Sequence, residues 1–344
     1  MMKTKLTRRG FLGTTAAMGA AFSTFGTGAL KGAEPAAKKF KTELHKAFIC
    51  DKPTEENVKA HAEAGFEGFE VTDWGMSDDE IKAGKKLADD YGLRVHSIMR
   101  GGWDLPFNGG DDAYREVCKE SVRKALRTAS LFGADTILLV PARIGELNGV
   151  GYPIPNPGDL NIEFNPDTLE ITKVVDGDNT PYQTYIDEHN RTSAIVTKTV
   201  EELIPAAAYY GVIIAIENVW NNLWLQPEIF AAYVRRFDDL WVKAYYDMGN
   251  HAKYAPTSVW LRALGKDVIA KLHLKDFAIE EGNPNTMFDG FCGFGTGTID
   301  WANVRNTIEE IGYNGWVSYE ENAYTPEGYG KRMDQWINGQ PITG

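Results

Sequence analysis

Four short apolar runs in the second half of the chain each end abruptly in a side chain that can bind a metal ion. Each run has the length and the β-branched or aromatic content of a buried strand. The residues that end them are Glu217, Asp247, His273 and Glu320. A carboxylate at the end of such a run is costly to bury unless a cation or hydrogen bonds compensate it.

The spacing of these four residues indicates repeated βα units. Glu217 and Asp247 are 30 residues apart, and Asp247 and His273 are 26 residues apart, about one strand–helix–strand repeat in each case. Parallel strands joined in this way place their carboxyl ends at one edge. The pattern therefore predicts a metal site at one rim of a parallel barrel.

The rest of the chain continues the same rhythm. Glycines follow several predicted helices and precede the next apolar run, as at Gly65 and Gly92. The strands that we predict are 46–50, 66–71, 94–99, 136–140, 212–216, 242–246, 269–274 and 316–319. Eight strands alternating with helices predict an α/β fold, a closed (β/α)8 TIM barrel that forms a single domain.

Residues 143–190 interrupt this rhythm after the predicted fourth strand. The segment contains five prolines and a short alternating piece at 169–175. A stretch of this length on the carboxyl side of a barrel strand lies where barrel active sites form. We interpret it as an insertion that acts as a lid and carries a small hairpin; a surface excursion without a catalytic role is the alternative.

The N-terminus has the composition of a targeting segment. Residues 1–33 carry five basic residues and no acidic one, and the sequence from Thr7 to Leu12 resembles a twin-arginine export signal. The following Ala/Gly-rich run is a poor transmembrane helix, and it contains no cysteine for a lipid anchor. We therefore predict a signal peptide at 1–33, a barrel at 34–344, export by the twin-arginine machinery, a periplasmic location and no stable membrane anchor; a disordered basic tail is the alternative.

Charge and cysteine content argue against a nucleic-acid-binding protein and against a fold held together by disulfides or by cysteine-bound metal. The formal net charge is −12, and the chain after residue 33 is more acidic still. Nucleic-acid binding needs clustered Lys and Arg, so it is not expected. Cys50, Cys118 and Cys292 are far apart, without metal-binding spacing, and we interpret them as small buried side chains.

Side-chain alternation along a strand decides which acids face the site. Because successive side chains point to opposite sides, Glu320 shares a face with Ser318, and Glu321 points outward. Three carboxylates and one imidazole suit a divalent ion in octahedral geometry: Mn²⁺ first, with Mg²⁺, Co²⁺ or Zn²⁺ as alternatives. The alternative interpretation is that each acid only anchors hydrogen bonds.

Several motifs together resemble the xylose isomerase-like TIM barrel superfamily, in its sugar phosphate isomerase and epimerase branch. They are FEGFEV, VHSI, IAIEN, YYDMGN, KLHLKD, GTGTIDW and GWVSYE, and they extend from about Leu44 to Asn322. The resemblance implies a divalent metal held by Glu217, Asp247, His273 and Glu320. It also implies that Glu217 and Glu320 are catalytic, one removing a proton next to a carbonyl and the other returning it.

The chain departs from the ketose 3-epimerase pattern within that family. Where that pattern has a second glutamate, an arginine and a histidine, this chain has Leu223, Ile279 and Asn250, with His251 next to Asn250. The missing arginine, together with Leu223, Trp220 and Trp224, indicates a differently shaped and more aromatic pocket.

Eight residues near predicted strand ends are candidate substrate contacts. His96 could instead be a buried core residue, and Trp103 and Trp220 could instead pack in the core. The candidates are Glu70, His96, Trp103, Arg143, Trp220, Asn250, His251 and Lys275. The glycines near 295–297 lack the strand and the Lys-Ser/Thr of a phosphate-binding loop, so we expect an unphosphorylated carbohydrate.

The sequence thus predicts a metal-dependent sugar isomerase or epimerase that abstracts a proton next to a carbonyl through a metal-stabilised enediolate. One alternative keeps the metal site but ends in elimination or hydrolysis of a 3-keto-glycoside. Another is a sugar-binding barrel that has lost catalysis. Which sugar is bound and whether the chain forms a homo-oligomer stay open.

Overall fold

The computed structural model describes residues 40–145, 151–283, 285 and 290–343. The predicted signal peptide at 1–33 lies outside the described residues, so the export route stays a prediction. Among the helices that the structure describes, none combines the length and the apolar composition needed to cross a bilayer.

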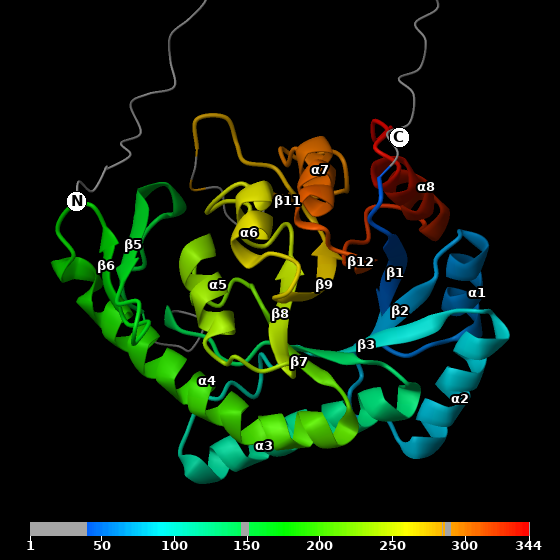
Figure 1. The fold of residues 1–344 in the computed structure, drawn as a ribbon, viewed down its shortest axis with the longest axis horizontal. Coiled ribbons are helices and arrows are strands. Elements are labelled where there is room, and N and C mark those ends of the chain that lie inside the picture. Colours follow the sequence, from blue (N-terminus) through cyan, green and yellow to red (C-terminus); the bar gives the residue numbers. More distant parts are fainter. Residues whose placement is uncertain (1–39, 146–150, 284, 286–289, 344) are drawn as a thin grey trace, which may run out of the picture. The chain divides into compact units, whose positions relative to one another are not determined.

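Eight parallel strands close into a barrel, as predicted (Figure 1). Around the barrel the order is β1-β12-β9-β8-β7-β4-β3-β2. The bounds are β1 Leu44–Cys50, β2 Gly68–Val71, β3 Arg94–Arg100, β4 Thr136–Leu139, β7 Ile213–Glu217, β8 Val242–Asp247, β9 Ile269–Leu274 and β12 Gly315–Tyr319. All eight pairings are parallel, so every carboxyl end opens at the same rim.

Eight α-helices follow the strands on the outside of the barrel. Their bounds are α1 Glu55–Glu63, α2 Asp78–Asp90, α3 Asp112–Phe132, α4 Gln183–Tyr210, α5 Pro227–Arg235, α6 Thr257–Leu264, α7 Trp301–Ile311 and α8 Pro326–Ile337. Thr54 and Ser77 form capping boxes, which satisfy the first backbone N–H groups of α1 and α2. Gly133 and Gly211 end α3 and α4 in the left-handed conformation that glycine adopts without strain.

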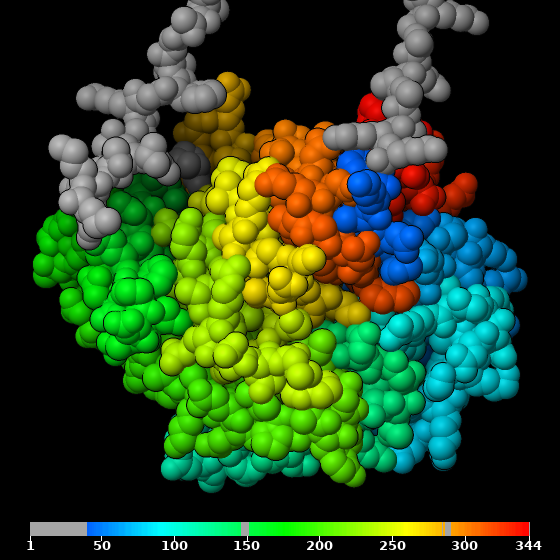
Figure 2. Space-filling model, in the orientation of Figure 1, coloured from blue at the N-terminus to red at the C-terminus, as the bar shows by residue number. Residues whose placement is uncertain are grey.

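The first and last units meet where the barrel closes. In the space-filling view, the blue start of the barrel lies against the orange and red units from the end of the chain (Figure 2). The buried Arg305 guanidinium on α7 joins them: it donates to Thr42 Oγ1 at 2.8 Å and to the Ile337 carbonyl at 2.9 Å. A multiply hydrogen-bonded buried cation of this kind fixes the closure geometrically.

The barrel has two layers of apolar packing. Outward-facing strand residues such as Ile98 and Ile214 join the helices in the main core. A smaller interior cluster fills part of the barrel, with Leu138, Ala215 and Tyr245 among its members. Burial on both faces explains why most of the strands are rich in apolar residues.

A β-bulge in β3 changes which side chains face the interior. The register with β2 passes from Phe69↔Val95 to Glu70↔Ser97, so His96 is an extra residue. Consequently His96 and Ser97 both point into the barrel, where each hydrogen-bonds another strand.

The segment between β4 and α4 contains an antiparallel hairpin, β5 Leu160–Phe164 with β6 Ile171–Val175. The Gln226 side chain, next to α5, holds the hairpin through Ile162 N and the Leu160 carbonyl. Helix α4 begins at Gln183, whereas we expected residues 143–190 to lie in the insertion. Residues 183–190 therefore belong to α4 and not to the insertion. The role of the segment as a lid stays a prediction.

Candidate metal centre

The four predicted ligands come together at the carboxyl-end rim. Glu217 ends β7, Asp247 ends β8, His273 lies near the end of β9, and Glu320 directly follows β12. One ligand atom from each lies within 4.8 Å of those of the others. Glu217, Asp247 and His273 are buried, and the Glu320 side chain is 30% exposed. Within the described part of the chain, this is the cluster of His, Cys, Asp and Glu side chains that could hold an ion.

Two buried atoms of the cluster that accept no hydrogen bond could bind a cation. Asp247 Oδ2 and His273 Nδ1 are buried and accept no hydrogen bond from described residues. His273 Nδ1 lies 3.4 Å from Glu320 Oε2 and 4.0 Å from Glu217 Oε1. An imidazole nitrogen surrounded by carboxylate oxygens needs either a proton or a metal ion between them. Three oxygen donors and one nitrogen donor suit a divalent ion.

Glu70 fixes the orientation of the His273 ring. His273 Nε2 lies 2.6 Å from Glu70 Oε2, and because an ionised carboxylate only accepts, Nε2 carries the proton. Ser97 Oγ donates to the other oxygen of Glu70 at 2.9 Å, and the Tyr245 hydroxyl donates to Oε2 at 3.2 Å. Nδ1 thereby points at the other three residues, and once it gives up its proton its lone pair is available to an ion, the usual arrangement behind a metal-bound histidine. We expected Glu70 to contact substrate; the structure places it behind His273.

Glu70→Gln is expected to weaken Mn²⁺ binding by about 10- to 100-fold, the usual cost of losing such a supporting group. The amide has one acceptor oxygen, so it cannot accept from His273, Tyr245 and Ser97 as the carboxylate does. Calorimetric titration of the metal-free protein measures the change, and Glu63→Gln on the exposed face of α1 is the matched control. An unchanged dissociation constant in Glu70→Gln would show that the ring is held in another way.

Asp247 is oriented by its neighbours so that one oxygen is left for an ion. Gly249 N and Asn250 N donate to Asp247 Oδ1 at 2.8 and 2.6 Å. The Asn218 side chain brackets the Asp247 backbone, accepting from its N–H at 2.7 Å and donating to its carbonyl at 2.8 Å. A Cβ at Gly249 would collide with the Lys275 carbonyl, so this turn requires glycine. The IAIEN and YYDMGN motifs are thus held together by the hydrogen bonds between Asn218 and the Asp247 backbone.

Lys275 supplies the positive charge nearest to the cluster. Its Nζ lies 2.7 Å from Glu320 Oε2 and 3.5 Å from Asp247 Oδ2, and it donates to Asn250 Oδ1 at 3.2 Å. Asn250 Nδ2 in turn donates to Glu217 Oε1 at 3.1 Å. Lys275 and Asn250, both predicted as substrate contacts, therefore touch the ligand residues directly.

Burial and neighbouring charges shift the pKa values of Glu217, Asp247 and Glu320 in different directions. Burial raises the pKa of Glu217 well above its ordinary value and that of Asp247 to about 6. Burial also acts to raise the pKa of Glu320, but the Lys275 ammonium and the His273 ring outweigh it and lower that pKa well below its usual range. In the absence of an ion, the pKa values of the two glutamates therefore move in opposite directions.

Thermal stability is expected to depend on pH in opposite ways with and without metal. A raised carboxyl pKa means that the folded protein binds more protons than the unfolded chain, so the metal-free form loses stability as pH rises from about 4 through 6. Metal ligands must be deprotonated, so metal binding strengthens over the same window. Melting temperatures of chelated and Mn²⁺-loaded protein between pH 5 and pH 8 measure this. Parallel curves would contradict the assignment of the carboxyl groups as ligands.

Among the other predicted contacts, His96 lies inside the barrel below the rim. Its ring stacks on Trp316 with centroids 4.6 Å apart, and Nε2 is 3.0 Å from Ser318 Oγ. His251 is also fully buried: it packs on Trp260 and Tyr254, and its Nε2 lies 3.0 Å from the Val219 carbonyl. Neither ring contacts a ligand candidate among the described residues, so the structure places both as packed histidines.

The remaining candidates differ in exposure. Trp103 is 38% exposed in the loop after β3. Arg143 follows β4, and its buried Nε–H donates to no acceptor among the described residues. Trp220 is buried and donates from Nε1 to the Asn250 carbonyl, which joins it to the cluster.

The aromatic pocket that we predicted from three apolar residues is only partly present. Trp224 stacks on Tyr233 at 4.0 Å and donates to Ser193 Oγ, and Leu223 is buried in the main core. Positive φ angles of 65° at Asn222 and 50° at Trp224 mark an unusual local turn of the backbone. Of the three residues, Trp220 alone reaches the rim.

The glycines near 295–297 have a structural role that the sequence did not reveal. Asp276 Oδ2 accepts from Gly295 N at 2.8 Å, Gly297 N at 3.0 Å and Trp301 Nε1 at 2.9 Å. Glu321, which we expected to point outward, accepts from the Asp276 backbone N–H. These contacts hold the loop before α7 against Asp276, which follows β9, and they engage the N–H groups of Gly295 and Gly297.

Comparison with known proteins identifies related chains. The family model described as "Xylose isomerase-like TIM barrel" matches residues 58–339. A curated protein of Escherichia coli (strain K12), "Putative L-ribulose-5-phosphate 3-epimerase SgbU", is 23% identical over 212 residues. That match covers 61% of this chain and 60% of the relative's length.

Solved structures share the fold. A D-tagatose 3-epimerase-like protein has a TM-score of 0.64 at 19% identity and covers 85% of this chain and 97% of its own. The 3-keto-D-glucoside 4-epimerase YcjR from E. coli has a TM-score of 0.59 at 15% identity, with 86% and 99% covered. D-psicose 3-epimerase from Clostridium cellulolyticum H10, solved with D-tagatose, has a TM-score of 0.55 at 16% identity, with 86% and 95% covered. The predicted enzyme class, an isomerase or epimerase, agrees with these relatives.

Proposed function

Because this chain belongs to the xylose isomerase-like TIM barrel family, we propose that it is a divalent-metal-dependent sugar isomerase or epimerase that moves a proton next to a carbonyl. The observation that carries the proposal is the pair of glutamates on either side of His273. Glu217 and Glu320 approach the same imidazole nitrogen, at 4.0 and 3.4 Å. Two carboxyl groups on opposite sides of one small space can remove a proton from one face of a substrate carbon and return one to the other.

The two glutamates are suited to different steps. Lys275 and the His273 ring lower the pKa of Glu320, which favours the ionised form that a general base needs, whereas burial raises the pKa of Glu217 in the absence of an ion. Asn250 donates to Glu217 Oε1, so the Glu217 carboxyl group has a fixed direction. Lys275, at 2.7 Å from Glu320, would also stabilise negative charge that develops on the substrate oxygen as an enediolate forms.

Glu217, Asp247, His273 and Glu320 would hold the metal ion. A divalent ion bound by these residues would supply Lewis-acid stabilisation of negative charge on substrate oxygens, an effect worth several kcal/mol. We propose an unphosphorylated sugar as substrate, since the N–H groups of the glycine loop are engaged by Asp276. We also propose export through the twin-arginine machinery, on the basis of the sequence from Thr7 to Leu12.

Turnover in deuterated water tests the proposal. Metal-loaded protein is incubated with ketoses, aldoses and 3-keto-glycosides, and the products are analysed by NMR and mass spectrometry. An isomeric sugar with solvent deuterium next to the carbonyl supports an isomerase or epimerase. Release of the aglycone would instead show elimination or hydrolysis. Binding of sugars without any turnover would show a sugar-binding barrel and overturn the proposal.

A further inference from the structure

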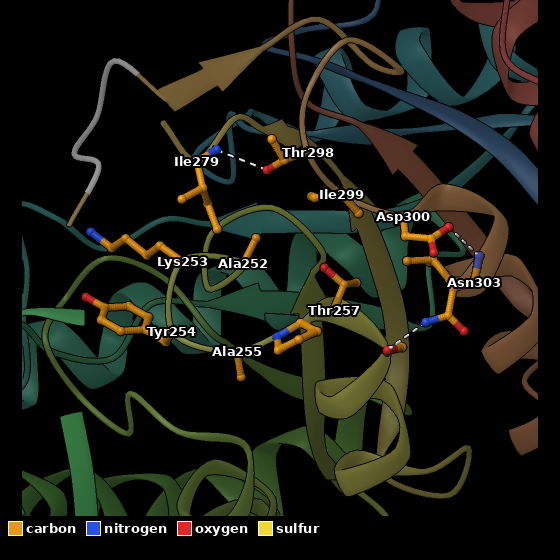
Figure 3. Close-up of a pocket in the computed structure, with 13 residues that line it drawn as sticks. Ala252, Lys253, Tyr254, Ala255, Thr257, Ile279, Thr298, Ile299, Asp300 and Asn303 are labelled. Carbon is orange, nitrogen blue, oxygen red and sulfur yellow. Dashed lines mark hydrogen bonds between the residues drawn. The ribbon is translucent and has the colours of Figure 1, made fainter. Parts of the chain in front are cut away.

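A hollow of about 330 Å³ lies between the loop after β8 and the start of α7 (Figure 3). The loop after β8 supplies Lys253 and Tyr254, and the segment between β9 and α7 supplies Ile279, Thr298 and Asp300. Both segments follow carboxyl ends of barrel strands. The hollow therefore belongs to the same end of the barrel as the four ligand candidates.

Trp220 packs against residues that line the hollow, Ala252 and Ile279 among them, and it also contacts the surroundings of the metal centre. Trp220 donates from Nε1 to the Asn250 carbonyl, and the Asn250 side chain donates to Glu217. On the other side, Lys253 Nζ lies 3.2 Å from the centroid of the Trp220 ring. A substrate with one unit at the glutamates and a second unit in the hollow would extend past this ring.

The lining combines apolar surface with separated polar groups. Tyr254 and Ile279 supply apolar area, as Ile299 does. Lys253 lies at one end, and Asp300 and Asn303 lie at the other (Figure 3). Asp300 accepts from Asn303 N at 3.0 Å and Asn303 donates to Ser258 Oγ at 3.1 Å, so this end is held in place.

This arrangement suits a sugar ring. A pyranose presents apolar C–H faces and a rim of hydroxyl groups that both donate and accept hydrogen bonds. An ammonium, a carboxylate and an amide around apolar walls match that pattern, whereas Asp300 would repel an anion. Ligand pockets usually span about 300–1,000 Å³, so a hollow of about 330 Å³ takes one small unit.

We propose that the hollow binds the second sugar unit of a glycoside whose first unit reacts at the metal centre. The inference rests on the proposed function and narrows its substrate class to disaccharides and related glycosides. Ile279 supports it, because an apolar side chain here forms the wall shared by Trp220 and the hollow.

Filling the hollow tests the inference. Ala255→Trp places a bulky ring in it, and Val259→Trp is the matched control, on the exposed side of α6 outside the lining. For Ala255→Trp, kcat/KM is expected to fall at least 10-fold more for keto-glycosides than for the free keto-sugar, with no such difference in the control. Lys253→Met keeps the aliphatic part of the side chain. Its kcat/KM is also expected to fall more for keto-glycosides than for the free keto-sugar, but by a smaller factor than in Ala255→Trp. Equal losses for both substrate types in both variants would overturn the inference.

A binding measurement separates failure of the subsite from failure of the proposed function. Saturation-transfer NMR of the metal-loaded protein with maltose, cellobiose and glucose is expected to show contact to both rings of at least one disaccharide. Contact to the second ring is lost in Ala255→Trp and kept in Val259→Trp. If no sugar is turned over but this pattern holds, the subsite stands and the proposed function falls. Contact to a single ring, or binding of glucose 1-phosphate in place of the disaccharides, overturns the subsite while leaving the isomerase assay unaffected.

Discussion

Replacing Glu217 with glutamine is expected to lower kcat by about 10²–10⁴-fold, the usual contribution of a positioned general acid or base. The amide cannot exchange a proton with the substrate, whereas it keeps the size of the side chain and an oxygen for the ion. Glu320→Gln is expected to have an effect of the same size, because Lys275 and His273 hold that carboxylate ionised for the complementary step. Isomerisation rates under substrate saturation measure both.

The control must show that the fall in kcat comes from the lost proton transfer and not from loss of the ion or of the fold. Glu228→Gln makes the same change at an exposed position in the first turn of α5 and is expected to keep the wild-type rate. Metal content and melting temperature are measured for all three variants, so that loss of the ion or of the fold is recognised. A metal-loaded, folded Glu217→Gln protein that turns over within threefold of wild type would remove Glu217 from the proposed mechanism.

The fold and the four ligand candidates could be predicted from the sequence because both follow from local rules. Most of the parallel strands are rich in apolar residues, and alternation along the strand fixes which end residue faces inward. The choice of Glu320 over Glu321 illustrates this: Glu320 joins the cluster, while Glu321 accepts from the Asp276 backbone. Strand ends that are one repeat apart meet at one rim, whatever the loops between them do.

The supporting contacts could not be predicted, because they depend on pairings between distant strands. Glu70 and His273 are 203 residues apart, and nothing near either one indicates their hydrogen bond. The bulge at His96 is equally hidden: one extra residue in β3 turns both His96 and Ser97 inward, which strict alternation forbids. Loop positions follow no period at all, so His251 and Trp224 could not be recognised as core residues.

Removal of metal ions is expected to abolish turnover and to lower the melting temperature. Three carboxyl groups whose oxygens lie within 4.8 Å of one another repel when ionised, and Lys275 compensates only part of that charge. An ion present at 100 times its dissociation constant stabilises the fold by about 2.7 kcal/mol. For a domain of this size, that corresponds to a shift of roughly 5 °C.

The experiment is dialysis against a chelator followed by addition of Mn²⁺, Mg²⁺, Co²⁺ or Zn²⁺, with rate and melting temperature recorded at each step. Asp247→Asn is expected to lose most of the response, because the oxygen that accepts no hydrogen bond belongs to this carboxylate. Asp89→Asn, an exposed position on α2, is expected to respond like the wild type. Two backbone N–H groups fix the other oxygen of Asp247, so this residue cannot turn away to relieve the repulsion, which in the metal-free protein only Lys275 and bound protons reduce. A chelated protein that keeps its rate and melting temperature would therefore mean that the cluster is held by protons and Lys275 alone, and that any chemistry at this rim proceeds without a metal.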